Sequence, residues 1–424
     1  MIDQKRMEKV LAVVLAGGAG ERLYPLTRHR AKPAVPFGGV YRLIDVTLSN
    51  CINSGCHKIQ VLVQYKSLSL HRHIRYAWNI LHAELGEFIE VISPQKRVGE
   101  NWYLGTADAI YQNLYSIVPE NPDQVLVLSG DHIYKMNYAK MLERHIEAGA
   151  DMTVATIEAP IEQANRFGVL ETDLHDRVIG FEEKPKQPHP MPDKPDKVLA
   201  SMGVYVFETE VLKRACCEDA ERMSSHDFGK DVIPRLIEDH RVYVHRFVDE
   251  NKKNAQYWRD VGTIEAYWEA NMDLVAVEPQ FNLYDKEWPI RTRVPVVPPA
   301  KFVFAEQGQR FGAAVDSIVS PGCIISGGMV RQSILSPEVR VHSYAVVEQS
   351  ILMGGVDIGH HARLRKAILE RNVQIPSYAV IGYDLEEDAK RYHVTPSGIV
   401  VVERGDQKAQ LAQELANAKG VYSA

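Results

Sequence analysis

Short apolar segments alternate with helical patterns from the start of the chain up to about residue 275. The apolar runs at residues 10–15, 59–63, 125–128, 152–157 and 204–207 predict strands. The first run, residues 10–15, is continuous and rich in β-branched side chains, which is typical of a strand buried on both faces of a sheet. Residues 138–148 follow the period of a helix instead. The alternation predicts an α/β, Rossmann-like domain with a mostly parallel sheet.

The pattern changes after Trp288, where four prolines within residues 289–299 predict a stiff, extended linker. Beyond the linker, four similar tetrapeptides begin at Asp316, Gln332, Gln349 and Lys366, at spacings of 16, 17 and 17 along the chain. Within these repeats apolar residues lie six apart, as at Ile318, Ile324 and Val330, and again at Val339, Ala345 and Ile351.

A six-residue spacing within a period of about 17 is what a triangular parallel β-helix requires, with one inward side chain for each short strand. We therefore predict about four coils of a left-handed β-helix. An antiparallel sandwich is the alternative, but its strands seldom keep so regular a phase. Because the helix ends in an open sheet edge, we expect capping or pairing with another copy of the chain.

These features predict three parts in the chain of 424 residues: a catalytic domain at 1–285, a linker at 286–304 and the β-helix at 305–424. The net charge is −6 and no basic block is present, which argues against a nucleic-acid surface. We find no apolar run long enough to span a membrane. The five cysteines form no CxxC pair, so we expect no zinc site and a reducing, cytoplasmic location.

A glycine-rich loop follows the first predicted strand. Leu15 ends the apolar run, and Gly17, Gly18 and Gly20 come next. Glycines let backbone N–H groups approach an anion, and a helix after the loop would add its positive N-terminal end. Arg22 and Lys32 supply cations nearby, so the loop predicts a phosphate site. The alternative is a turn that needs glycine only for close packing.

Known phosphate-binding fingerprints do not account for this loop. A dinucleotide fingerprint that starts at Gly18 would need glycine where Leu23 stands, and a Walker loop needs Gly-Lys-Ser/Thr after four spacers.

Two aspartates are candidate metal ligands. Asp131 follows a buried strand and a glycine, at the sheet edge where α/β proteins hold ligands, and Asp260 stands in the segment Trp-Arg-Asp-Val-Gly-Thr. Two carboxylates with phosphate oxygens and water form the usual shell of Mg²⁺. For Asp131 the alternative is a helix cap.

A lysine, an acid and an aromatic segment suit a sugar phosphate. Lys184 can bind a phosphate while Glu183 accepts hydrogen bonds from hydroxyls, unless the two form only a solvated pair. Trp102 and Tyr103 precede Gly105 and suit a ring with a polar edge, although both aromatic types are equally common in cores.

Taken together, these motifs resemble those of a known enzyme family. The glycine loop continues into Lys-Pro-Ala-Val at residues 32–35, and residues 102–109 and 200–207 are similar to two further signatures. With residues 225–231, 258–263 and 288–292, the chain resembles the bacterial, glycogen-forming glucose-1-phosphate adenylyltransferases over essentially its whole length.

The resemblance implies that ATP and glucose 1-phosphate react to give ADP-glucose and pyrophosphate. It implies that Leu15, the loop glycines, Arg22 and Lys32 face ATP, and that Asp131 and Asp260 hold Mg²⁺. The residues implied for the glucose 1-phosphate site, or close to it, are Tyr103, Gly168, Glu183, Lys184, Ser201, Tyr205, Asp227 and Phe228. Glu21 departs from the family pattern, because Ser, Thr or Lys usually stands there.

The resemblance also implies a homotetramer that is regulated by a small anionic effector. The residues implied for the effector site are His29, Arg30, Arg42 and Arg391, with ordinary surface arginines as the alternative. His29, Pro36 and Pro119 depart from the enteric pattern, so we expect a different effector from that branch.

Three other functions compete with this interpretation. A β-helix acyltransferase could use His342, His360 or His361 as a base, but it leaves the whole predicted α/β domain unexplained. A non-catalytic regulatory subunit is disfavoured because the candidate catalytic residues are retained. A related enzyme with another nucleotide or sugar stays open, since no residue pattern proves adenine.

Overall fold

The computed structural model describes residues 4–18, 20–95, 102–253, 256–306 and 310–404. The chain divides into two compact units, each drawn from several stretches of sequence. Unit 1 comprises residues 1–18, 44–258 and 286–290, and unit 2 comprises residues 19–43, 259–285 and 291–424. Ala19, in the glycine loop, lies outside the described residues.

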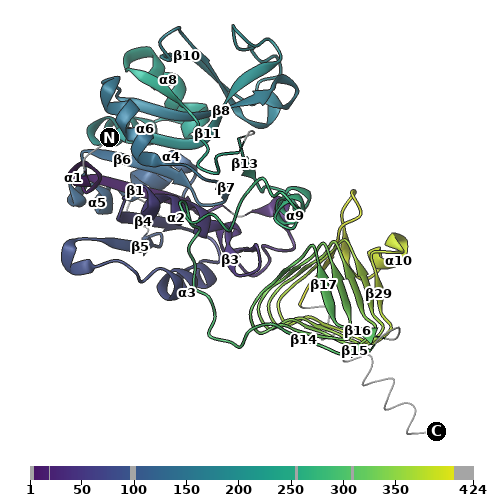
Figure 1. The fold of residues 1–424 in the computed structure, drawn as a ribbon. Coiled ribbons are helices and arrows are strands. Elements are labelled where there is room, and N and C mark those ends of the chain that lie inside the picture. Colours follow the sequence, from purple (N-terminus) through teal and green to yellow (C-terminus); the bar gives the residue numbers. More distant parts are fainter. Residues whose placement is uncertain (1–3, 19, 96–101, 254–255, 307–309, 405–424) are drawn as a thin grey trace. The chain divides into compact units, whose positions relative to one another are not determined.

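Unit 1 is built on a nine-stranded sheet whose central order is β10-β9-β11-β6-β1-β4-β5, with β8 pairing both β11 and β12 (Figure 1). The strands are β1 (Val10–Ala16), β4 (Lys58–Val63), β5 (Phe88–Ile92), β6 (Gln124–Ser129), β8 (Met152–Pro160), β9 (Gly168–Thr172), β10 (Val178–Glu183), β11 (Lys197–Glu208) and β12 (Val242–Arg246). Strands β6, β1, β4 and β5 are parallel neighbours, as predicted. The long strand β11 runs antiparallel to β6, β8 and β9.

Helices and short elements complete unit 1. They are α1 (Gln4–Met7), α3 (Leu68–Ala77), α4 (Thr106–Gln112), α5 (Leu114–Ile117), α6 (Tyr138–Glu147), α7 (Thr209–Ala220), a π-helical turn at Phe228–Val232 and α8 (Ile233–Asp239), together with the short strand β7 (His132–Tyr134). There are also 3₁₀ turns at Ala83–Leu85, Val118–Glu120 and Ile161–Arg166. Helix α2 (Leu43–Asn53) and strand β13 (Trp258–Asp260) each span a boundary between the units.

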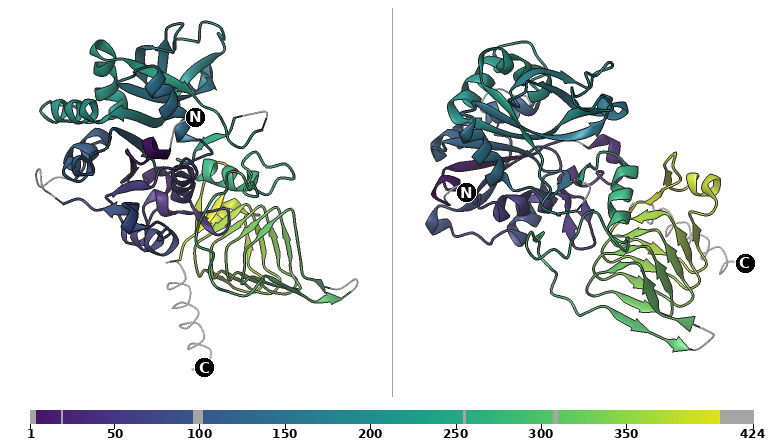
Figure 2. Two further views of the ribbon diagram at one scale, coloured as in Figure 1. Left: turned by 60° about the vertical axis from the view of Figure 1, so that its left-hand side comes forward. Right: turned by 45° about the horizontal axis from the view of Figure 1, so that its top comes forward.

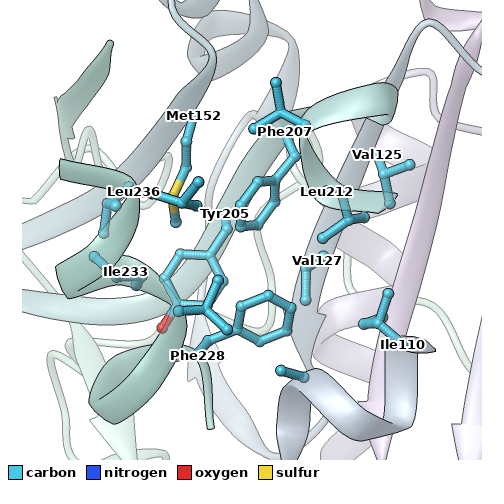
Figure 3. Close-up of a cluster of buried hydrophobic side chains, with 14 of the residues drawn as sticks. Ile110, Val125, Val127, Met152, Tyr205, Phe207, Leu212, Phe228, Ile233 and Leu236 are labelled. Carbon is cyan, nitrogen blue, oxygen red and sulfur yellow. The ribbon is translucent and has the colours of Figure 1, made fainter. Parts of the chain in front are cut away.

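One hydrophobic core of unit 1 lies between the sheet and helices α4, α7 and α8. Val125 and Val127 from β6 pack there with Phe207 from β11 and Phe228 (Figure 3). The alternation of strands and helices in the sequence thus produces the predicted layered domain.

Unit 2 contains a parallel β-helix with three sheets. The first sheet contains β14 (Lys301–Val303), β19 (Ile324–Ser326), β22 (Arg340–Val341), β25 (Asp357–Ile358) and β28 (Gln374–Ile375). The second sheet contains β17 (Ala313–Val315), β20 (Met329–Arg331), β23 (Val346–Glu348), β26 (Arg363–Arg365) and β29 (Val380–Ile381). The third sheet contains β18 (Ile318–Val319), β21 (Ile334–Leu335), β24 (Ile351–Leu352), β27 (Ala367–Leu369), β31 (Val400–Val402) and β30 (His393–Val394). Four successive coils each give one strand to every sheet, and β28, β29 and β31 form a further coil (Figure 2).

The remaining elements of unit 2 are short. They are 3₁₀ turns at Glu21–Leu23 and Lys32–Ala34, the hairpin strands β2 (Pro36–Phe37) and β3 (Tyr41–Arg42), helix α9 (Ile264–Asp273), the hairpin strands β15 (Ala305–Glu306) and β16 (Arg310–Phe311), and helix α10 (Leu385–Ala389).

The repeated tetrapeptides form one corner of the β-helix. Their first residues have positive φ, as at Gln349, where φ is 47°. A serine follows in the first three repeats, and Ser333 and Ser350 are buried. These serines form a ladder: the backbone N–H of Ser350 donates to Oγ of Ser333 at 3.0 Å, and that of Ala367 donates to Oγ of Ser350 at 3.2 Å. The repeat therefore encodes a turn that serine hydroxyls join from coil to coil.

One part of the predicted interior is wrong. We expected Ile318, Ile324 and Ile351 to point inward, but the interior cluster contains or contacts the next residue in each case: Val319, Ile325 and Leu352. Successive side chains of a strand point to opposite faces, so these isoleucines face outward. In the third sheet, Ile318, Ile334 and Ile351 are register partners and form an outward isoleucine ladder. A Cβ on Gly39 would stand 3.6 Å from Ile318 Cγ2, which places residues of the 19–43 segment over this ladder.

The predicted helix after the glycine loop is also wrong. Only a three-residue 3₁₀ turn, Glu21–Leu23, follows the loop. Pro25 has no N–H to continue a helical ladder, and the chain then runs through a second 3₁₀ turn at Lys32–Ala34. The loop therefore offers a ligand glycine amides and side-chain cations, and no terminus of a following α-helix.

Candidate active site

The turn between β6 and β7 places Asp131 at the carboxyl end of the parallel strands. The backbone N–H of Gly130 donates to the carbonyl of Leu15 at 3.1 Å, so the turn lies against the end of β1. The Ser129 hydroxyl donates to Oδ1 of Asp131, and Nε2 of His132 lies 3.8 Å from the same oxygen. Because strand β7 follows at once, Asp131 caps no helix, and the helix-cap interpretation is wrong.

The first two glycines of the loop follow β1 in unit 1. A Cβ on Gly17 would stand 3.2 Å from Cβ of Gln64, at the end of the neighbouring strand β4, whereas one on Gly18 would meet nothing within 4 Å. Packing therefore restricts Gly17, and open space at Gly18 leaves its backbone accessible to a ligand.

Arg22, Lys32 and Asp260 lie together in unit 2. Nζ of Lys32 is 3.0 Å from Oδ1 of Asp260. Atoms of both Arg22 and Asp260 lie within 3.2 Å of where a Cβ on Gly262 would stand, so a side chain at this position would crowd both groups. Gly20 has a φ of 64°, and a Cβ on it would stand 3.0 Å from Lys32, so this loop also closes tightly. The structure thus joins three of the four predicted catalytic residues.

The two candidate metal ligands, Asp131 and Asp260, have different neighbours, but both are partly exposed carboxylates that could bind a metal through oxygen. The Asp131 side chain is 22% exposed and that of Asp260 is 28% exposed. The described part of the chain contains no group of three or more His, Cys, Asp and Glu residues that could hold a metal. Mg²⁺ commonly takes one or two carboxylates and completes its shell with substrate phosphates and water, and this donor set fits that use. The residues stand in different units, so a shared ion stays a prediction.

Glu183 is the last residue of strand β10, and Lys184 follows it. Nζ of Lys184 lies 3.0 Å from Oε1 of Glu183, and the lysine side chain is 56% exposed. The other carboxylate oxygen of Glu183 would stand 2.9 Å from a Cβ on Gly168 and 3.0 Å from one on Gly229. The carboxylate therefore occupies a narrow space between two glycine backbones, which is more than a solvated surface pair requires.

The segment before α4 holds Tyr103 in a fixed orientation. Nδ2 of Asn113 donates to the Tyr103 hydroxyl at 2.9 Å. Burial raises the pKa of Tyr103, so its phenol is protonated at neutral pH and can donate to a sugar oxygen. A Cβ on Gly105 would stand 2.2 Å from the carbonyl of His226, which explains the glycine. The tyrosine segment and residues 225–228 are thereby packed together.

Asp227 organises the start of the π-helical turn. One of its oxygens accepts from the backbone N–H groups of Gly229 at 3.0 Å and Lys230 at 3.2 Å, and the other accepts from the Thr106 hydroxyl at 3.1 Å. The same hydroxyl accepts from the N–H of Phe228 at 3.0 Å. Asp227 therefore fixes the local backbone.

The rings of Tyr205 and Phe228 pack against each other in the core of unit 1. Their ring centroids are 5.7 Å apart, and Phe228 is 1% exposed (Figure 3). Burial raises the pKa of Tyr205, whose hydroxyl also interacts with Ser201. The structure thus brings Tyr205, Phe228 and Ser201 together, with Phe228 packed in the core.

The predicted effector residues have partners of their own. Arg30 forms a bidentate ion pair with Glu370 of the β-helix, at 2.6 and 2.8 Å. Arg42 donates to the carbonyl of Ala34 at 3.2 Å, and Arg391 lies 3.5 Å from Glu387 of α10. His29 is exposed.

Comparison with known proteins decides the family. A nucleotidyl transferase profile matches residues 11–276, and a profile described as GlmU-like, C-terminal hexapeptide matches residues 298–402. A glucose-1-phosphate adenylyltransferase of Koribacter versatilis is 58% identical over 401 residues, which cover 94% of this chain and 96% of the relative. This chain belongs to the glucose-1-phosphate adenylyltransferase family.

Two further glucose-1-phosphate adenylyltransferases agree. That of Rhodopirellula baltica is 54% identical over 95% of this chain and 92% of its own length, and that of Paramagnetospirillum magneticum is 53% identical over 94% of both. The matched profiles confirm the predicted fold, a nucleotidyltransferase domain followed by a left-handed β-helix. No helix in the described ranges is long and apolar enough to cross a membrane.

Sequence reasoning missed several groups that hold the candidate site residues in place. Thr106 and Asn113 orient Asp227 and Tyr103, and the ring of Trp258 packs edge-on against His132 with centroids 5.2 Å apart. Thr106 and Trp258 do stand inside the quoted motifs. Asn113 gave no signal, because its partner lies a full helix away from it in the chain.

Proposed function

We propose that this chain transfers the adenylyl group of ATP to glucose 1-phosphate and releases pyrophosphate, which makes ADP-glucose for glycogen synthesis. An oxygen of the glucose 1-phosphate attacks the α-phosphorus of ATP in line, and the bond to the pyrophosphate oxygen breaks. That nucleophile is already ionised at neutral pH, so the reaction needs positioning and charge neutralisation rather than a general base.

Residues of the glycine loop are assigned to ATP. Leu15, Gly17, Gly18 and Gly20 present backbone groups to the phosphates, and Arg22 and Lys32 neutralise the departing pyrophosphate. The ion pair of Lys32 with Asp260, at 3.0 Å, supports this role because it fixes the ammonium group before substrate arrives.

Residues around β10 and α4 are assigned to the sugar phosphate. Lys184 binds the phosphate, Glu183 accepts from sugar hydroxyls and Tyr103 donates to the ring edge, with Ser201 and Asp227 beside them. The position of Glu183 supports this assignment, because the backbones of Gly168 and Gly229 lie against its carboxylate and hold it at the end of β10, beside Lys184.

A divalent cation completes the proposal, and Mg²⁺ is the ion that we expect. Asp131 and Asp260 would hold it, and when bound it would neutralise phosphate charge. The chain's own contribution is to present Asp131 in a fixed turn.

The observation that carries the proposal is the identity of 58% and 53% to two adenylyltransferases, each along 94% of the chain. The test is pyrophosphate release when purified protein is mixed with ATP, Mg²⁺ and glucose 1-phosphate. Release that depends on both substrates supports the proposal and excludes an acyltransferase. Absence of release, with the chain folded, contradicts it.

Replacement of Lys184 by Gln should raise KM for glucose 1-phosphate by about 10-fold to 100-fold and leave kcat near its original value. The reason is that a charge-assisted hydrogen bond of about 1.5–3 kcal/mol is lost in ground state and transition state alike. Steady-state kinetics for both substrates measure this, with Lys186→Gln on the adjacent exposed loop as the control. A rise confined to the KM for ATP would reverse our assignment of the two subsites.

The proposal includes regulation and assembly. We propose that residues 305–424 serve both, that the enzyme is a cytoplasmic homotetramer, and that an anionic sugar phosphate or carboxylate binds near His29, Arg30, Arg42 and Arg391. Because Arg30 already holds Glu370, such an anion must compete with that carboxylate. Assays against a panel of glycolytic intermediates test this, and a flat response to all of them would refute it.

A further inference from the structure

Helix α2 carries buried polar side chains at positions where a core helix is usually apolar. Thr47 and Asn50 are each 0% exposed, as are Asp45 and Ser49. Buried polar groups need specific partners to offset their loss of water. The partners of Thr47 and Asn50 lie on either side of Asp131 in the chain.

Thr47 holds the residue before the carboxylate turn. Its hydroxyl donates to the carbonyl of Ser129 at 2.9 Å. Ser129 is the last residue of β6, and its own hydroxyl donates to Asp131. The carbonyl and the side chain of one residue therefore connect α2 to the Asp131 carboxylate.

Asn50 holds the segment after the turn. Its Nδ2 donates to the carbonyl of Tyr134 at 3.0 Å, and its Oδ1 accepts from the N–H of Met136 at 3.3 Å. The turn that carries Asp131 is thus fixed at both ends by one helix.

Asn50 also bonds to the segment that begins at Trp288, to which the proposed reaction assigns no role. The indole N–H of Trp288 donates to Oδ1 of Asn50 at 2.8 Å, and Nδ2 of Asn53 donates to the carbonyl of Pro289 at 2.9 Å. Trp288 is 8% exposed. The start of the linker is therefore bonded to the amide that supports the Asp131 turn.

We propose that Thr47 and Asn50 are positioning residues for Asp131, and that Trp288 completes their network by holding the Asn50 amide. This rests on the proposed metal-binding role of Asp131. Groups that orient a metal ligand without touching the metal commonly change affinity by about 10-fold or more when they are lost.

The test compares Thr47→Val, which removes the hydroxyl at nearly constant volume, with Thr47→Ser, which keeps it. Mn²⁺ binding to the purified enzyme with ATP is measured by electron paramagnetic resonance, alongside kcat and both KM values. We expect Thr47→Val to weaken Mn²⁺ binding and lower kcat by about 10-fold each with little change in KM for glucose 1-phosphate. Thr47→Ser should stay within about twofold of the original values.

Thr153→Val is the matched control, because that hydroxyl is also buried and bonds to His145. Thr153 lies level with Leu126 near the start of β6, whereas Asp131 follows the end of β6. If Thr47→Val fails to fold, Trp288→Phe removes a single N–H while keeping a ring in place, and it should weaken Mn²⁺ binding severalfold. Unchanged Mn²⁺ binding in the folded variant overturns the proposal. Asp131→Asn is measured in parallel: if it too leaves Mn²⁺ binding and kcat unchanged, the role of Asp131 itself is refuted.

Discussion

Replacement of Asp131 by Asn should lower kcat by about 10²-fold or more, the usual cost of losing one preorganised electrostatic group in an active site. The substitution removes a negative charge and almost no volume. The amide oxygen can still accept from the Ser129 hydroxyl, which now donates to Asp131, so the turn should keep its shape. The loss is therefore one of charge at the reacting phosphates rather than of structure.

The matched control for Asp131 is Asp239→Asn, an exposed aspartate at the end of α8. It should leave kcat unchanged, and circular dichroism should show both variants folded. A near-normal kcat for Asp131→Asn would remove this residue from the mechanism and leave Asp260 as the sole candidate carboxylate.

Replacement of Glu370 by Ala should loosen the segment that carries Arg30 and Lys32 from the β-helix. Arg30 and Glu370 are 12% and 9% exposed, and their two hydrogen bonds are 2.6 and 2.8 Å long. Removing one partner of a buried pair costs about 3 kcal/mol or more, because the remaining charge has lost its water and its counterion. Opening of the segment should then become about 100-fold more frequent.

Native-state hydrogen exchange measures this opening directly. The amides of Val35 and Leu43 donate within the segment, to Lys32 and Val35 at 3.0 and 3.1 Å, and serve as probes. In Glu370→Ala they should exchange about 100-fold faster, whereas Glu386→Ala, an exposed change in α10, should leave them unaltered.

A double variant separates charge burial from packing. Arg30→Ala with Glu370→Ala removes both charges, so it should destabilise the segment less than Glu370→Ala alone. The opening free energies of the two single variants and the double variant are then compared. If the change in the double variant equals the sum of the changes in the single variants, the Arg30–Glu370 pair has no interaction energy of its own, and our proposal that it holds the segment is wrong.

The repeats and the strands could be predicted because their signals are local. Each coil of the β-helix repeats the same short pattern, as at Gln332 and Gln349, so the period appears without knowledge of any distant contact. The same holds for β1 and β6, whose apolar runs identify buried strands.

Long-range pairings could not be predicted in this way. Arg30 and Glu370 are 340 positions apart, and Asn50 and Trp288 are 238 apart. Nothing in the local pattern selects one acid or one indole for such a partner, because tertiary packing sets the pairing. For the same reason the outward isoleucines of the β-helix looked like interior residues. Their regular spacing shows that they share one face of a sheet, but it does not show whether the interior or another segment of the chain covers that face.

The candidate site was found mainly where motif and strand end coincide. Asp131 and Glu183 follow strands, and glycines stand close to both in the fold. Groups that bond to the surroundings of the site lie outside these motifs: Thr47 in α2 bonds to Ser129, and Asn113, between α4 and α5, bonds to Tyr103. Such groups emerge only when each buried polar atom is matched to its partner.

The most direct test of the account is to compare nucleotides. Purified protein is supplied with Mg²⁺, glucose 1-phosphate and either ATP, UTP, GTP or dTTP, and nucleotide sugar and pyrophosphate are quantified. We predict ADP-glucose and pyrophosphate in equal amounts, with kcat/KM for ATP at least about 10-fold above the others, equivalent to about 1.4 kcal/mol of discrimination. Faster turnover of another nucleotide, or no nucleotide sugar from ATP, would contradict the proposed function.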